Sequence, residues 1–191
     1  MKVIGISGSP RRGGNTDQSL QIVLDSLKQE GIAGELFPVG GLPVRGCLAC
    51  GWCMNNQVNR CVQTEDYMNT LIEKMMAADG ILLASPVYYA DITPEIKAVI
   101  DRVGFVTRSN GSTLARKVGA GIAIARRAGA IHSFDSLNHF FLINEMIIPG
   151  SSYWNVGYGL SKGDIQEDAE GVETLRTLGE NMAWLLKKLK G

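Results

Sequence analysis

The sequence predicts an α/β domain in which helices cover both faces of a doubly wound parallel sheet. Short apolar runs alternate along the 191 residues with longer segments whose apolar side chains recur every three or four positions. The run Ile81–Ala84 is apolar without a break, which is typical of a strand that is covered on both faces. Strands that alternate with helices of this length form parallel sheets, and we expect a single domain over residues 1–191.

The first third of the chain predicts two strands, one helix and an insertion. Val3–Ile6 is short, apolar and rich in β-branched residues, which favours a strand. A Gly/Ser loop follows, and then a helix over about 16–30 whose apolar residues form a stripe. Glu35–Val39 predicts the second strand. Residues 40–65 show no periodicity and carry every cysteine, so we expect a functional insertion there.

The rest of the chain continues the alternation. Pro94 favours the start of a helix, because the first helical turn tolerates a missing N–H group. The remaining helices are expected over 66–78, 93–103, 131–144 and 165–190, and the remaining strands over 81–84, 117–125 and 146–148.

Charge and composition exclude several classes of partner. The chain has 19 basic and 19 acidic residues, so it lacks the basic excess that binding to nucleic acid or to an anionic membrane requires. Its longest apolar runs are far too short to cross a bilayer. The start Met1–Ile4 leads into a Gly/Ser loop without a secretory signal, so we expect a cytoplasmic protein. Because the cytosol is reducing, structural disulfides are not expected.

The four cysteines lie close together, at Cys47, Cys50, Cys53 and Cys61. Their C-x2-C-x2-C-x7-C spacing can bring four thiolates round one [4Fe–4S] cluster. A tetrahedral zinc site more often uses two separated C-x2-C pairs, and here Cys50 would have to serve both gaps. Exchanging redox thiols, and thiols that are merely packed or solvent-facing, are the other interpretations.

The loop after the first strand has the composition of a phosphate site. Free backbone N–H groups, the dipole of the following helix and several polar side chains suit a bound phosphate. These side chains are Ser7, Ser9, Asn15 and Thr16. The loop has neither the G-x-G-x-x-G spacing of dinucleotide sites nor the G-K-[ST] of triphosphate sites. An ordinary Gly-rich turn is the alternative.

Two later loops are expected to meet the first, because the carboxyl ends of parallel strands share one edge of the sheet. One loop offers aromatic rings and backbone polar groups for a flat heteroaromatic ring, although a packed tyrosine pair would look the same. It contains Pro86, Val87, Tyr88 and Tyr89. The other loop, 126–129, could place Arg126 or Arg127 near an anionic ring nitrogen of a reduced cofactor, or could be a solvated turn.

Three sets of residues resemble one known family. They are Gly5-Ile6-Ser7-Gly8-Ser9-Pro10-Arg11 with Gly14-Asn15-Thr16, then Ser85-Pro86-Val87-Tyr88-Tyr89, then Lys97 with Asp101-Arg102. In these motifs, over about residues 1–130, the chain resembles the NADPH-dependent FMN reductase family, which has a flavodoxin-like fold. The compact cysteine motif is similar to that of its iron–sulfur flavoprotein branch, with a last gap at the long end of the branch's range.

The resemblance implies five strands in the order 2-1-3-4-5, with FMN bound where the strand order reverses. It implies that the FMN phosphate lies on Ser9, Arg11, Asn15 and Thr16. It places the isoalloxazine ring against Pro86, Val87, Tyr88 and Tyr89, with Asp91 and the turn Arg126-Arg127-Ala128-Gly129 nearby. An arginine of that turn would stabilise the negative charge of the reduced ring.

The implied function is electron transfer by an FMN-dependent oxidoreductase, with a [4Fe–4S] cluster on the four cysteines as a second centre. Family members are commonly dimers or tetramers, so we expect a homodimer or homotetramer. A redox protein or a small-molecule donor or acceptor is the expected partner, with NAD(P)H as a candidate donor. Two alternatives stay open: an NAD(P)H-dependent FMN, quinone or azo-type reductase without a cluster, and a zinc- or thiol-based sensor or interaction module.

Overall fold

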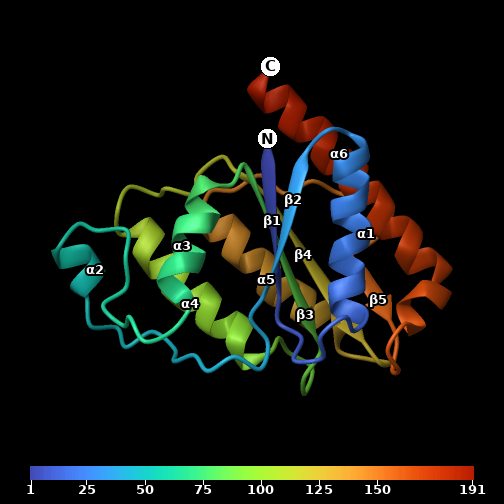
Figure 1. Ribbon diagram of the computed structural model, residues 1–191, viewed down its shortest axis with the longest axis horizontal. Coiled ribbons are helices and arrows are strands. Elements are labelled where there is room, and N and C mark those ends of the chain that lie inside the picture. The colour runs from blue at the N-terminus through green and yellow to red at the C-terminus, as the bar shows by residue number, and fades with distance from the viewer.

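A five-stranded parallel sheet in the order β2-β1-β3-β4-β5 lies at the centre of the structure (Figure 1). This computed structural model describes residues 1–191. The strands are β1 (Lys2–Ser7), β2 (Ala33–Pro38), β3 (Gly80–Pro86), β4 (Val118–Ala125) and β5 (Val156–Tyr158). The predicted α/β class, the number of strands and the strand order are confirmed.

Helices cover both faces of this sheet. The helices of the whole chain are α1 (Asn15–Gln29), α2 (Trp52–Asn55), α3 (Met68–Ala77), α4 (Pro94–Arg108), α5 (Ala130–Ile143), the 3-10 helix η1 (Asp164–Glu167) and α6 (Ala169–Lys190). Helices α1 and α6 pack on one face and contact each other, while α3, α4 and α5 cover the other face (Figure 1). The sheet is therefore the middle of three layers.

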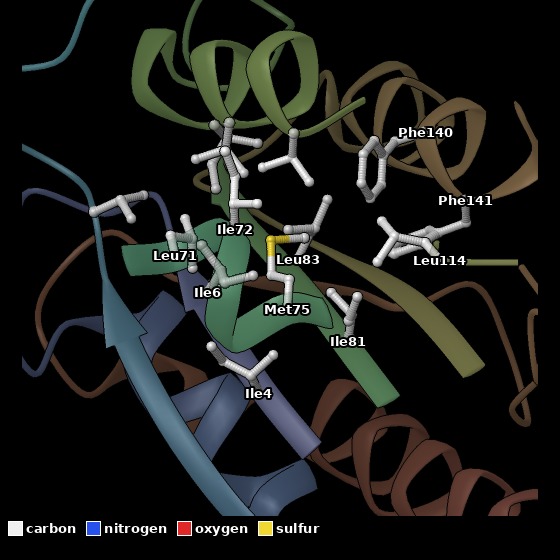
Figure 2. Packing of buried hydrophobic residues seen from close by; sticks show 14 of the residues in the cluster. Ile4, Ile6, Leu71, Ile72, Met75, Ile81, Leu83, Leu114, Phe140 and Phe141 are labelled. Carbon is white, nitrogen blue, oxygen red and sulfur yellow. The ribbon is translucent and has the colours of Figure 1, made fainter. Parts of the chain in front are cut away.

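Two hydrophobic cores hold the layers together. Successive residues of a strand point to opposite faces, so Ile4 and Ile6 lie in the core under α3, α4 and α5, whereas Val3 lies in the core under α1 and α6. Figure 2 shows Ile4 and Ile6 beside Leu71 and Met75 of α3. Because full burial of each such side chain contributes about 1.5–3 kcal/mol, the two cores fix the sheet that carries the loops.

The edge strand lies at a different place from its prediction. The sequence predicts the last strand at 146–148, but β5 is Val156–Tyr158. Ile147 forms only an isolated parallel bridge with Val118, while β5 pairs with the far end of β4. The apolar run at 146–148 has the composition of a strand, but Pro149 follows it and cannot donate to a ladder, so pairing stops.

The predicted C-terminal helix is divided at its start. Its first turn is η1, and α6 begins at Ala169, after Asp168. The Asp168 carboxylate accepts a hydrogen bond from the N–H of Gly171 at 3.0 Å, which caps α6. None of the helices combines the length and the apolar composition that a bilayer span requires.

Residues 40–65 leave the sheet and lie beyond α3 and α4, on the side remote from α1 and α6 (Figure 1). Their one regular element is the single turn α2. Ala49 and Gly51 have positive φ angles of 51° and 69°, which bend the chain between the cysteines. The insertion therefore takes its shape from turns and side-chain contacts rather than from the sheet.

Both chain ends lie at the amino edge of the sheet, opposite the loops that follow the strands (Figure 1). The carboxylate of Asp79 joins them. This carboxylate accepts a hydrogen bond from the backbone N–H of Lys2 at 2.8 Å. It also forms an ion pair with Nζ of Lys190 at 2.9 Å.

Candidate functional site

Three loops meet at the carboxyl edge of the sheet (Figure 1). After β1, the N–H of Gly8 donates to a carbonyl oxygen of β3 at 2.8 Å, and after β3, the N–H of Val87 donates to the Ile124 oxygen of β4 at 2.8 Å. The turn after β4 also contacts the loop after β3, because a Cβ on Gly129 would lie 2.8 Å from the Cα of Ala90. The loops form one surface where doubly wound sheets bind their ligands.

The first turn of α1 presents free N–H groups to this surface. Its first helical hydrogen bond joins the N–H of Gln18 to the oxygen of Gly14 at 3.0 Å. The N–H groups of Asn15, Thr16 and Asp17 therefore lack a helical partner, and the Thr16 side chain is buried beside them. With the positive end of the helix dipole, these groups suit a phosphate.

Hydrogen bonds within the loop after β1 fix its shape. The Ser7 hydroxyl donates to the Asp17 carboxylate, which also accepts from the N–H of Gly13 at 2.7 Å. The Ser9 hydroxyl is buried and accepts from the N–H of Arg11 at 3.2 Å. Ser7 thus stabilises the loop from within. A role of Ser7 and Ser9 at a phosphate stays a prediction.

The C-terminal part of the chain closes over the same loop. The amide nitrogen of Asn15 donates to the Ser161 oxygen at 2.9 Å, and its amide oxygen accepts from the N–H of Gly163 at 2.9 Å. Nη1 of Arg11 donates to the Leu160 oxygen at 3.1 Å. Asn15 and Arg11 therefore hold the segment before η1 against the loop, and their place at a phosphate also stays a prediction.

Lys162 is a further candidate that the sequence reasoning missed. Its Nζ donates to the Arg12 oxygen at 3.3 Å, and a Cβ on Gly13 would lie 3.0 Å from that nitrogen. An ammonium group beside the N-terminal turn of α1 adds positive charge where a phosphate is expected. A single lysine in a Gly/Ser-rich irregular segment was the only signal in the sequence.

The loop after β3 is a tight hairpin that projects its tyrosines. The backbones of Tyr88 and Asp91 pair in both directions, at 2.8 and 3.0 Å. Between them Tyr89 and Ala90 have φ angles of 49° and 66°, the left-handed pair of a type I′ turn. Tyr89 is fully exposed at the tip. Left-handed backbone costs non-glycine residues about 1–2 kcal/mol each, and such strain is typical of ligand sites.

Asp91 fastens this hairpin to α5. Its carboxylate accepts from the N–H of Ile92 at 2.7 Å and from the Ser136 hydroxyl at 2.9 Å, and His132 lies 3.6 Å away. The hydrogen bond from Ile92 and then that from Ser136, together with the nearby His132, hold the pKa of Asp91 below its ordinary value despite partial burial. Asp91 is therefore an ionised anchor of the hairpin.

The turn after β4 combines close packing with exposed charge. Gly129 has a φ of 85° and contacts Ala90, so a side chain at this position would strain the backbone and push the hairpin away. Arg126 and Arg127 are exposed at the same turn. Their guanidinium groups are thus exposed next to the hairpin.

The four cysteines line one cavity of about 180 Å³ at the opposite end of α4. Cys50 is exposed, while Cys47, Cys53 and Cys61 are partly buried, and all four are free thiols. Arg102 and Phe105 of α4 form the inner wall, and most of the other lining side chains are apolar. The structure therefore brings the four predicted ligands together round one space.

The donor set of this cavity has the chemistry of an iron–sulfur site. Burial raises the pKa of Cys53, and the neighbouring Cys61 and Cys47 add to the rise. The side chains as they stand do not converge closely enough to hold a metal ion. Four thiolates round one space are the ligand set that iron–sulfur clusters use.

A larger cavity of about 640 Å³ lies between α4 and α5 and adjoins both regions. Asp91 of the hairpin stands at its wall, and Phe105 and Ser109 line this cavity and the cysteine cavity alike. Helix α4 thus connects the two regions.

Sequence comparisons identify relatives over the whole chain. The family model described as NADPH-dependent FMN reductase matches residues 1–161. An iron-sulfur flavoprotein of Methanocaldococcus jannaschii is 34% identical over 202 residues, with 100% of both chains covered. An iron-sulfur flavoprotein of Methanosarcina thermophila is 32% identical over 193 residues, with 100% of this chain and 97% of that protein covered.

Solved structures share the fold at lower identity. RosB, crystallised with the bound intermediate 8-demethyl-8-formylriboflavin-5'-phosphate, has a TM-score of 0.81 at 19% identity, with 100% of this chain and 80% of that chain covered. A flavodoxin from the domain Archaea has a TM-score of 0.64 at 13% identity, with 98% and 99% covered. From the family match and the full-length relatives, the chain belongs to the NADPH-dependent FMN reductase family, in its iron–sulfur flavoprotein branch, and is an FMN-dependent oxidoreductase.

Proposed function

We propose that this oxidoreductase passes electrons between FMN at the carboxyl edge of the sheet and a [4Fe–4S] cluster on the four cysteines. One observation carries the proposal: Cys47, Cys50, Cys53 and Cys61 line a single cavity whose wall contains no histidine or carboxylate. The names of the iron-sulfur relatives support it. A cluster bound there would supply one-electron chemistry.

We propose that the three loops divide the binding of FMN between them. The phosphate group would be bound by Ser9, Arg11, Asn15 and Thr16, with the free N–H groups of α1 and with Lys162, while Ser7 holds the loop in shape through Asp17. The ring would be bound by Pro86, Val87, Tyr88 and Tyr89, with Asp91 and Gly129 fixing the hairpin and its neighbouring turn. FMN supplies the redox chemistry, whereas Arg126 or Arg127 stabilises the negative charge of the reduced ring.

The distance along α4 supports an oligomer. Pro94, beside the hairpin, and Phe105, at the cysteine cavity, are eleven residues apart on this helix. A rise of 1.5 Å per residue separates them by about 16 Å. Electron transfer slows steeply with distance, so a homodimer or homotetramer that brings the hairpin of one copy near the cysteines of another would shorten the path.

The donor and acceptor are proposed only by class. NAD(P)H or a redox protein would deliver reducing equivalents to FMN, and a redox protein or small molecule would accept them. Four free thiols are best maintained in a reducing compartment, so we infer a cytoplasmic protein that works as one domain over residues 1–191.

Anaerobic purification followed by iron, sulfide, zinc and flavin quantitation tests the proposal. We expect about four iron and four sulfide atoms per FMN, and a molar mass in solution above that of one chain. FMN without iron and sulfide would instead favour an NAD(P)H-dependent FMN or quinone reductase, which NAD(P)H oxidation would then detect. Zinc in place of iron would favour the metal-based sensor.

A further inference from the structure

One charged side chain is buried at the cysteine cavity. Arg102 of α4 is 1% exposed and is the largest fully buried side chain of the protein. Burial of a cation is costly unless it is paired and hydrogen-bonded, so a buried arginine indicates a constraint at that place. No role in the FMN site accounts for it, because the hairpin lies at the other end of α4.

The guanidinium of Arg102 joins the two ends of the cysteine segment. Nη1 forms an ion pair with the Asp66 carboxylate and donates to the Arg45 oxygen at 3.2 Å. Nη2 donates to the Gln63 oxygen at 3.0 Å. Arg45 and Gln63 stand two residues outside the first and the last cysteine. One planar group therefore closes the loop that carries all four thiols.

Neighbouring side chains reinforce this closure. Nε2 of Gln63 donates to the Gly46 oxygen at 3.1 Å, which ties the outgoing chain to the incoming chain. The buried Asn69 side chain accepts from the N–H of Cys61 at 2.8 Å and donates to its oxygen at 3.0 Å. Asp66 also accepts from the N–H of the first residue of α3 at 3.1 Å. The closed loop is thus fixed to both α3 and α4.

One nitrogen of the Arg102 guanidinium has no acceptor at all. Its Nε–H is buried and has no hydrogen-bond partner. Arg102 and Cys61 both line the cysteine cavity, and the Asp66 carboxylate is already paired with Nη1. A neutral thiol is a weak acceptor, whereas a thiolate or a sulfide is a strong one.

We propose that Arg102 is a positioning residue of the cysteine site with two roles. Its Nη groups hold the ends of the segment 45–63 together, so that the four sulfurs face one space. Because Arg102 lines the cysteine cavity, its Nε–H would donate to a sulfur atom of the bound centre, and its charge stabilises the reduced centre. In that reduction one electron leaves reduced FMN and enters the centre, and no bond is made or broken.

The first role is independent of any cluster, whereas the second rests on the proposed function. Two variants separate them. Arg102→Lys keeps the charge and loses the planar fork, and Arg102→Gln loses both. Arg108→Gln is the matched control, because Arg108 is exposed on the same helix and does not line the cysteine cavity.

Hydrogen exchange of the iron-free, FMN-loaded protein tests the first role. In both Arg102 variants we expect amide exchange across 45–63 to rise at least about tenfold, while β1 and β3 exchange as in the wild type. Arg108→Gln should exchange like the wild type. If the amides of 45–63 exchange in Arg102→Gln at the same rates as in the wild type, this role is overturned. Should Arg102→Gln fail to retain FMN, Arg102→Lys decides by the same readout.

The reduction potential of the anaerobically reconstituted protein tests the second role. We expect Arg102→Gln to lower the equilibrium constant for reduction of the centre about tenfold, which lowers its reduction potential by about 59 mV for a one-electron couple. Arg102→Lys should fall less, Arg108→Gln should not change, and Asp66→Asn, which removes the counter-charge, should raise the potential. Equal potentials in the wild type and Arg102→Gln would overturn this role. A wild type that takes up no iron would refute the proposed function, and the exchange result alone would then decide the first role.

Discussion

The carboxyl edge of the sheet and the cysteine segment 45–63 are built by different means. At the carboxyl edge the strand register brings three loops together, and backbone hydrogen bonds connect them. The cysteine segment lies outside the sheet, and side chains such as Arg102 and Asn69 close it. The first region takes its shape from the scaffold, and the second from a few long-range contacts, so the two should respond differently to substitution.

Two glycines show the same contrast. A Cβ on Gly40 would lie 2.2 Å from the backbone carbon of Ser9, so the chain after β2 packs directly on the loop after β1. A Cβ on Gly46, six residues later, would meet nothing within 4 Å. Close packing of backbone therefore ends where the cysteine segment begins.

The largest expected effect comes from Gly40→Ala. The added methyl group collides with backbone that cannot move aside, so we expect a loss of about 3 kcal/mol in the free energy of unfolding and release of FMN. Gly46→Ala is the control and should change stability by about 0.5 kcal/mol or less. Denaturation curves and flavin content measure both. Equal behaviour of the two variants would contradict the difference in packing.

Removal of one thiol tests whether the two regions are independent. We expect Cys50→Ala and Cys53→Ala to lose iron while they retain FMN, since no cysteine contributes to the loops at the carboxyl edge. Iron and flavin quantitation of anaerobic samples measures this. Met54→Leu, which alters another sulfur-bearing side chain of the same cavity, should keep its iron. Unchanged iron in both cysteine variants would eliminate the cluster assignment.

Single side chains in the loop after β1 should have smaller effects on FMN binding, because backbone N–H groups form much of the proposed phosphate site. We expect Ser9→Ala and Asn15→Ala to weaken FMN binding about tenfold each, or about 1.4 kcal/mol. The double variant should bind more weakly than either. Gln21→Ala, an exposed change on the same helix, is the control. Flavin titration of the apoprotein gives the dissociation constants, and undiminished affinity in the double variant would exclude both residues from the phosphate site.

The smallest effect concerns the carboxylate that anchors the hairpin. The pKa of Asp91 is below its ordinary value of 3.8 in the folded protein. Its stabilisation is therefore complete above that value and is lost as the pH falls through the lower folded pKa. We expect the free energy of unfolding of Asp91→Asn to depend slightly less on pH in the acid range than that of the wild type. The difference is small because the Asp91 side chain is half exposed. Ser136→Ala should reduce this dependence less, and an unaltered pH dependence in both variants would remove Asp91 as an anchor.

The same contrast explains how much the sequence could predict. Local periodicity predicted most helices and strands, and the buried run of β3 supported a parallel sheet, whereas the strand order was implied by the family resemblance. The position of β5 could not be predicted from the sequence. Its three residues form a strand because they pair with β4 in the folded protein, not because their composition favours a strand. Lys162 reaches the loop after β1 from 150 residues away, and no local pattern reports such a contact. Arg102 follows the apolar stripe of α4, and nothing in its spacing distinguishes a buried arginine from a solvated one.

Asp79 holds Lys2 and Lys190 together at the amino edge of the sheet, through a hydrogen bond and an ion pair. A surface tether attached beside these residues would face away from the loops at the carboxyl edge (Figure 1). An electrode-bound form could then present those loops outward to solution.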